Sequence, residues 1–302
     1  MAAGRAHSAP RPGRETTMTD SPSRTPSEAK RSRQAAWSGR ADVYQRYHGQ
    51  MSMQAVGPLL AAVGVSTGSE GAGNGGAGLR VLDVGCGPGY GAGEAARRGA
   101  FAAGLDLSRA MVGLAAGNVP GAAFVQGDGE NLPFADGRFH AVISCFAMPQ
   151  MPDPARAVAE AFRVLAPGGR YGIALRAGAE QDPNKRMVLA AVAAHGDAVE
   201  TAFRTLHDGG LRDPAAYLPL LDAGRFTAIT RTELPVTWRP EGDREFLDAI
   251  NAGSRSSKLL DCQSPAARRR IDQALVEAAA RYKGPGGYSI PRHAVILSAQ
   301  KP

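Results

Sequence analysis

The sequence contains few cysteines and no long hydrophobic run. Its three cysteines are widely spaced in a chain of 302 residues, and their number is odd. This pattern argues against a disulfide framework and against a zinc site, so we expect reduced thiols and no metal. No run of 18 apolar residues occurs, and no apolar signal-peptide segment follows the first Met. We therefore predict a cytoplasmic protein that has no membrane partner.

Most of the chain also lacks excess positive charge, because that charge is concentrated near the N-terminus. Residues 1–40 hold eight Lys or Arg against three acids, while the net charge of the whole chain is +7. Residues 1–36 are rich in Ser, Pro, Arg and Ala, which predicts a disordered basic tail. The remainder carries little net charge, which argues against an extended nucleic-acid footprint. Met18 begins the run MTDSP and offers an alternative start.

The run VLDVGCGPGYGA at residues 81–92 is the strongest local signal. Its apolar residues suit a buried parallel strand, and Asp83 falls at the C-terminal end, where open α/β sheets bind ligands. Gly85, Gly87 and Gly89 then allow the backbone to approach a ligand closely. Helix-forming residues follow, so the run predicts a strand, a glycine turn and a helix.

The nature of the ligand depends on Asp83, because the glycines alone also satisfy the dinucleotide pattern G-x-G-x-x-G/A. The Asp83 carboxylate would repel a pyrophosphate and attract an ammonium group. S-adenosylmethionine carries an ammonium group and a sulfonium charge, and it has no phosphate. Asp83, Gly85, Gly87 and Gly89 match the motif E/D-x-G-x-G-x-G position for position. In this motif the chain resembles the class I S-adenosylmethionine-dependent methyltransferases.

Two later strands are predicted to end in acids that complete a nucleoside site. The run FAAGLDLS ends its strand at Asp106, 23 residues after the first acid, where a carboxylate can accept both ribose hydroxyls. Leu107 would then lie against the adenine face. The run FVQGDGENLPF predicts a third strand ending at Asp128, which can accept from the adenine amino group, while the Gly129 amide donates to the ring. Three such acids fit a nucleoside cation better than a dinucleotide.

The resemblance covers residues 37–175 closely and the rest loosely. It is closest to the ubiquinone/menaquinone C-methyltransferases and to bacterial natural-product methyltransferases, in which the run D-x-x-x-L-P-F is typical. The resemblance implies an α/β fold with a Rossmann-like, seven-stranded, doubly wound sheet. In that fold the last strand runs antiparallel between strands five and six. It also implies S-adenosylmethionine as cofactor and Cys145 as a further cofactor contact.

The remaining segments are predicted to close over this core. Residues 37–78 carry helical periodicity with a break near Gly49 and then a glycine-rich connector, which suits a helical lid. Residues 79–175 form the core, and residues 176–302 add substrate-side helices, a helical insertion and the last two strands. The lid residues expected to face inward are Tyr44, Arg46, Tyr47 and His48. Among them, Arg46 could meet the cofactor carboxylate through a charge-assisted bond.

No catalytic base follows from the sequence. Related proteins often carry a His pair where Pro149 and Gln150 stand, and glutamine cannot take a proton near neutral pH. The weak candidates for a catalytic role are Tyr44, His48, Gln150 and His195. Because histidines and carboxylates are scarce around the fourth strand, the sequence favours an acceptor that is already activated.

We therefore predict a methyltransferase that acts on C, O or N of a small molecule, in bacterial specialised metabolism, with homo-oligomerisation left open. The sequence leaves three alternatives. An RNA or DNA methyltransferase is disfavoured because the run N/D-P-P-Y/F and the catalytic Pro-Cys are absent. A nicotinamide dehydrogenase is disfavoured by Asp83 and Asp128. A protein that binds S-adenosylmethionine without methyl transfer, for instance to steer a cyclisation, has no distinguishing feature in the sequence.

Overall fold

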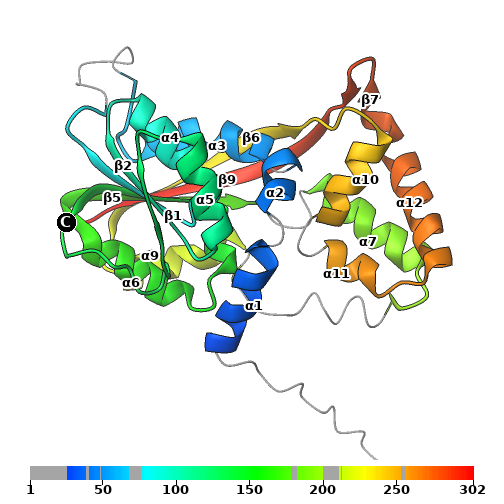
Figure 1. The fold of residues 1–302 in the computed structure, drawn as a ribbon, viewed down its shortest axis with the longest axis horizontal. Coiled ribbons are helices and arrows are strands. Elements are labelled where there is room, and N and C mark those ends of the chain that lie inside the picture. Colours follow the sequence, from blue (N-terminus) through cyan, green and yellow to red (C-terminus); the bar gives the residue numbers. More distant parts are fainter. Residues whose placement is uncertain are drawn as a thin grey trace, which may run out of the picture.

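A computed structural model describes residues 26–38, 41–47, 49–67, 76–177, 182–199, 211, 213–252 and 256–302. Its centre is a seven-stranded sheet (Figure 1). In chain order the strands are β1 (Arg80–Val84), β2 (Phe101–Asp106), β3 (Ala123–Gln126), β4 (Phe139–Cys145), β5 (Leu165–Arg176), β6 (Thr227–Trp238) and β9 (Ile290–Gln300). A separate small ribbon pairs β7 (Lys283–Gly284) with β8 (Gly287–Tyr288).

The strand order across the sheet is β3-β2-β1-β4-β5-β9-β6. Strands β1 to β5 are parallel, whereas β9 runs antiparallel to both β5 and β6. The predicted fold is therefore confirmed, including the last strand between the fifth and sixth. Parallel neighbours need crossover connections, and helices supply them here. These helices are α4 (Tyr90–Arg97), α5 (Arg109–Asn118) and α6 (Pro154–Val164), while α9 (Leu218–Ala223) precedes β6.

Both faces of the sheet are buried, because alternate residues of each strand point to opposite sides. Val81 and Ile143 pack in a cluster with α4 and with α3 (Gly49–Ala62). Leu82 and Val142 pack in the opposite cluster with α6 and α9. A doubly wound sheet is covered by helices on both faces. Its central strands therefore bury side chains on both sides, which is why they are continuously apolar.

Among the described residues, four helices form a group beyond one end of the sheet, called the helical cap below (Figure 1). It has its own apolar cluster, which includes the stacked rings of Phe246 and Tyr288. The cap is tied to the sheet by a buried ion pair of 2.6 Å between the side chains of Arg292 and Asp182. The helices of the cap are α7 (Pro183–His195), α10 (Asp243–Ala252), α11 (Ser256–Asp261) and α12 (Pro265–Ala279).

The N-terminal region departs from the sequence prediction. Helix α1 (Pro26–Ser38) overlaps the segment predicted to be disordered, so that prediction is wrong for residues 26–36. The physical reason is a tertiary ion pair between Lys30 and acids of the core, which composition cannot reveal. Residues 1–25 lie outside the described chain. Helices α2 (Ala41–Tyr47) and α3 follow, and the predicted break near Gly49 falls where α3 begins.

Two strand boundaries also differ from expectation. Strand β3 ends at Gln126, so Asp128 lies in the loop after the strand. Residues 167–169 have the turn-forming sequence P-G-G and would be expected to precede the strand. Strand β5 nevertheless begins at Leu165 and includes them, because a register shift against β4 accommodates Gly168 at a φ of 76°. Among the described residues, no helix has the length and hydrophobicity needed to cross a membrane.

Candidate functional site

The carboxyl ends of β1, β2 and β4 and the loop after β3 meet at one edge of the sheet, and a cavity opens there. Helices α1 and α2 complete its wall. The cavity is therefore built from segments far apart in the sequence. It is lined by Lys30, Arg33, Trp37, Tyr44, Gly85, Gly87, Leu105, Asp106, Leu107, Met111, Asp128, Gly129, Glu130, Cys145, Phe146, Ala147, Gln150, Met151 and Pro152.

The glycine turn between β1 and α4 forms the floor of the site. Gly85 has a φ of 73°, and a Cβ there would lie 2.2 Å from the Cβ of Ala147. Gly89 caps α4 with a φ of 92°. A Cβ at Gly91 would lie 2.4 Å from the Oδ2 of Asp83. The turn therefore excludes side chains and exposes backbone at the start of a helix, where N–H groups stabilise negative charge.

Asp83 is buried below this turn, and only 1% of it is exposed. Its Oδ2 accepts the Ala92 N–H at 3.0 Å, whereas its Oδ1 has no hydrogen-bond partner among the described residues. Burial raises the pKa of Asp83 to about 7. Asp83 lines a second, smaller cavity together with Tyr44, Ser52 and Cys145. The unpaired oxygen fits a cationic group of a ligand, such as an ammonium.

Asp106 lies at the end of β2 and is held in place by backbone donors. The Gly87 N–H donates to its Oδ2 at 2.9 Å, and the Ser108 N–H donates to its Oδ1 at 2.8 Å. Each oxygen keeps capacity for another donor. Burial raises the pKa of Asp106. Leu107 and Met111 form an apolar wall beside this carboxylate. The arrangement suits a sugar diol next to a flat ring.

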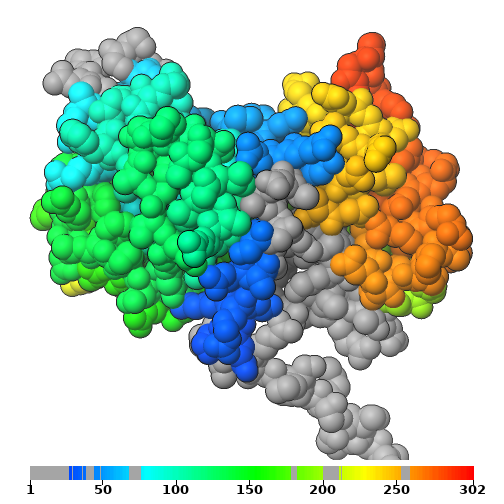
Figure 2. Space-filling view, viewed as in Figure 1, coloured from blue at the N-terminus to red at the C-terminus, as the bar shows by residue number. Residues whose placement is uncertain are grey.

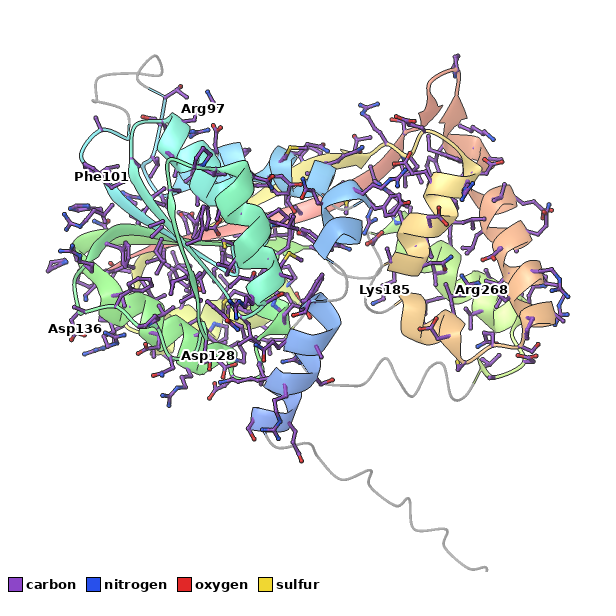
Figure 3. The ribbon with its side chains drawn as sticks, viewed as in Figure 1. Arg97, Phe101, Asp128, Asp136, Lys185 and Arg268 are labelled. Carbon is purple, nitrogen blue, oxygen red and sulfur yellow. The ribbon has the colours of Figure 1, made fainter. Side chains whose placement is uncertain are left out.

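Asp128 and Gly129 follow β3, and Asp128 lies beside α1 (Figure 3). The Glu130 N–H donates to the Asp128 Oδ1 at 2.9 Å. A Cβ at Gly129 would lie 2.7 Å from the Cε of Met151 and 2.9 Å from a methyl of Val84, so the loop needs glycine there. The Gly129 backbone can therefore approach a ligand closely.

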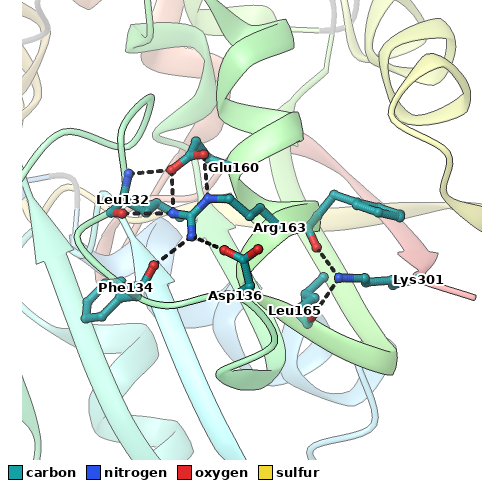
Figure 4. Close-up of polar contacts among 8 residues, drawn as sticks. Leu132, Phe134, Asp136, Glu160, Arg163, Leu165 and Lys301 are labelled. Carbon is teal, nitrogen blue, oxygen red and sulfur yellow. Dashed lines mark hydrogen bonds and ion pairs between the residues drawn. The ribbon is translucent and has the colours of Figure 1, made fainter.

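The continuation of this loop is anchored to α6 (Figure 4). Arg163 of α6 donates to the Leu132 and Phe134 carbonyls at 3.0 and 2.7 Å, and it pairs with Asp136 and Glu160. Glu160 in turn accepts the Leu132 N–H at 2.8 Å. Such a satisfied network fixes the loop, and with it the position of the residues after β3.

The other predicted cofactor contacts differ in whether they line the two cavities. Cys145 lines both cavities, and burial raises the pKa of its thiol, which keeps it neutral. Gly89 lines neither cavity, because it serves as the cap of α4. Arg46 is exposed on α2, with its guanidinium 5.4 Å from the ring centre of Tyr47. Arg46 is therefore outside the lining of both cavities.

The four catalytic candidates are separated by the fold. Tyr44 lines both cavities, and Gln150 lines the larger one. His195 is the last residue of α7 in the helical cap and lines neither cavity. His48 lies outside the described residues. Among the described residues, no cluster of three or more His, Cys, Asp or Glu could hold a metal ion.

Several wall residues were missed by sequence reasoning. Lys30 and Arg33 of α1 line the cavity although their segment was predicted to be disordered, and Trp37, which was predicted to begin the helical lid, lines it too. Their spacing of three and four residues places them on one face of a helix, which is the signal that could have identified them. Phe146 was missed as well, and its φ of 60° is unusual for a residue with a side chain.

For the methyl transfer predicted from the sequence, the Tyr44→Phe variant is expected to keep the rate within about fivefold, whereas loss of a true general base costs at least about 100-fold. Burial raises the pKa of Tyr44 to about 12, and its hydroxyl is hydrogen-bonded to Ser52 at 2.9 Å. Losing that bond should lower the free energy of unfolding by about 1 kcal/mol. Ser52→Ala is the matched control for stability. A 100-fold slower transfer with normal cofactor affinity would instead make Tyr44 catalytic.

Part of this chain is similar in sequence to known proteins. Residues 82–173 match the family described as "Methyltransferase domain". A phthiotriol/phenolphthiotriol dimycocerosates methyltransferase of Mycobacterium ulcerans is 47% identical over 96 residues, which are 30% of this chain and 35% of the relative. A demethylmenaquinone methyltransferase of Renibacterium salmoninarum is 38% identical over 97 residues, 32% of this chain and 41% of the relative. The chain thus spans less than half the length of these relatives.

The fold is shared with solved structures at lower identity. A crystal structure described as a putative methyltransferase from Bacillus halodurans has a TM-score of 0.51 and 21% identity, covering 82% of this chain and 98% of that one. The matched segment, residues 82–173, contains the glycine turn and strands β2, β3 and β4 of the sheet. Residues 82–173 of the chain therefore match a methyltransferase domain, and the chain shares its fold with the solved structure from Bacillus halodurans.

Proposed function

We propose that this chain transfers the methyl group of S-adenosylmethionine to a small-molecule acceptor. The observation that carries the proposal is the set of three acids at or just beyond the carboxyl ends of β1, β2 and β3. They line two cavities that share Gly85, Gly87 and Cys145. Asp83 would take the methionine ammonium, Asp106 the ribose hydroxyls, and Asp128 with Gly129 the adenine. The unpaired oxygen of Asp83 supports the first assignment. The two backbone-held oxygens of Asp106 support the second.

The described residues support a mechanism based on alignment. The bound cofactor supplies a methyl group activated by a sulfonium. Tyr44 and Cys145 at this site are neutral near pH 7, since burial raises the pKa of both, and Gln150 does not titrate. The chain would hold the acceptor in line and exclude water, and such positioning can carry much of the rate. We therefore propose an acceptor that is already electron-rich.

The acceptor would enter beside Phe146 and Met151, where the wall is apolar. The named relatives from Mycobacterium ulcerans and Renibacterium salmoninarum support a small, largely apolar acceptor. The composition is rich in Ala, Gly and Arg, which is typical of a GC-rich bacterial gene, and we place the reaction in specialised metabolism of the cytoplasm. Neither nucleic acid nor a membrane is proposed as partner.

Calorimetric titration with S-adenosylmethionine, S-adenosylhomocysteine and NAD tests the cofactor. We expect micromolar affinity for the first two and none for NAD. Incubation with methyl-labelled cofactor and a panel of quinols, phenols and amines then tests the reaction. Binding of NAD in place of S-adenosylmethionine would overturn the cofactor assignment. Cofactor binding together with conversion of an acceptor without label transfer would favour the non-methylating alternative.

A further inference from the structure

Helix α1 places the ammonium group of Lys30 against two acids of the loop after β3. The Lys30 Nζ lies 2.7 Å from the Asp128 Oδ2 and 2.5 Å from the Glu130 Oε2. The Glu130 side chain is only 2% exposed, and its other oxygen accepts the Asp153 N–H at 2.8 Å. Removing one partner from a buried charge pair is costly, because the remaining charge is left without water. The positive charge of Lys30 therefore compensates the negative charges of Asp128 and Glu130.

Two further turns of α1 also reach the cavity. The Arg33 side chain lines it, and its Nη1 is buried without a hydrogen-bond partner among the described residues. Trp37 lines the cavity too, with its ring edge-on to Tyr44 at 5.5 Å. The Ser38 hydroxyl lies 3.2 Å from that of Ser108, which caps α5.

The space-filling view shows α1 (dark blue) against the core, on the side that faces the helical cap (Figure 2). Helix α1 also contacts α5, which follows Asp106 in the chain. One helix thus borders the regions assigned to ribose and adenine. It lies entirely outside the matched segment 82–173, so the family match gives no information about it.

We propose that α1 is part of the cofactor site and that Lys30 is its positioning residue. By pairing with Asp128 and Glu130, Lys30 fixes the Asp128 carboxylate toward the adenine amino group and holds α1 over the bound cofactor. Opening of this contact then limits how fast the cofactor leaves. This inference rests on the proposed function, because it assumes that adenine lies at Asp128.

The test is the dissociation rate of S-adenosylhomocysteine, measured by stopped-flow displacement. Lys30→Met keeps the aliphatic stem and removes the charge, so dissociation should become about five- to tenfold faster. Lys30→Arg restores the charge and should bring the rate back toward wild type. Arg31→Met is the matched control, because Arg31 is exposed on the same helix, and its rate should stay unchanged.

Salt provides a readout that a purely structural role would not change. Added NaCl should accelerate dissociation from wild type, since it screens the partly exposed ion pair, and it should act less on Lys30→Met. An unchanged rate in Lys30→Met, with normal binding by wild type, overturns this inference alone. Slower dissociation would also overturn it, because Lys30 would then compete with adenine for Asp128. Absence of binding by wild type overturns the proposed function and this inference together.

Discussion

Replacing Asp106 with alanine is expected to weaken binding of S-adenosylmethionine by about 1.5–3 kcal/mol, or roughly 10- to 150-fold. Both carboxylate oxygens are fixed by the Gly87 and Ser108 N–H groups, so the acceptors for the ribose hydroxyls are already in place before binding. Calorimetric titration measures the change in Kd. Unchanged affinity would show that Asp106 does not hold the ribose.

Two further variants separate binding from folding. Asp106→Asn keeps one acceptor oxygen and should give an intermediate loss of affinity, because a neutral amide makes a weaker hydrogen bond than a carboxylate. Asp222→Ala removes an exposed acid on α9 and should leave the Kd unchanged. Thermal unfolding of all three variants shows whether loss of the two backbone hydrogen bonds has loosened the turn.

The affinity for S-adenosylhomocysteine is expected to rise by roughly 50-fold between pH 5 and pH 7, because one proton must leave Asp83. Burial raises the pKa of this carboxyl to about 7, so the free protein holds it mostly protonated at pH 5. The ligand ammonium favours the ionised form. Binding therefore strengthens as pH rises toward 7 and levels off above it. Calorimetry across this range measures the slope.

Asp83→Asn is the control for this pH dependence. The variant should bind more weakly and should lose most of the slope, while any slope that remains reports Asp106, whose pKa is also raised. The sign for stability is opposite. The native pKa lies above the unfolded value, so this group alone makes the free energy of unfolding fall from about pH 4 to pH 7. An unaltered slope in Asp83→Asn would place the titrating group elsewhere.

The core of the fold could be predicted from sequence because its signals are local. Apolar strands, glycine turns and acids at strand ends recur along residues 81–176, and each signal lies within one strand–turn–helix unit. The antiparallel β9 was predicted only through resemblance. Its pairing with β5 joins residues more than 100 positions apart, and no local pattern encodes such a pairing.

The candidate site was predicted less completely. Asp83, Asp106 and Asp128 line the two cavities, whereas Arg46 and His195 line neither. Helical periodicity showed that Arg46 is on a helix but could not show which face turns inward. The role of α1 was missed for a different reason. This basic, proline-containing segment folds because it pairs with acids that are distant in the sequence. The composition of the segment indicates only how the segment behaves in isolation.

Strand β9 begins outside the main sheet. Ala294 is its first residue paired with β5, whereas residues 290–293 pair with β6 alone. Strands β6 and β9 thus extend as a pair beyond the main sheet, and the helical cap packs against this extension. Substitutions in the cap therefore need not disturb the strand ends that line the candidate site. The cap can diverge in sequence during evolution while the candidate site stays constant, and identity confined to residues 82–173 carries no information about the cap.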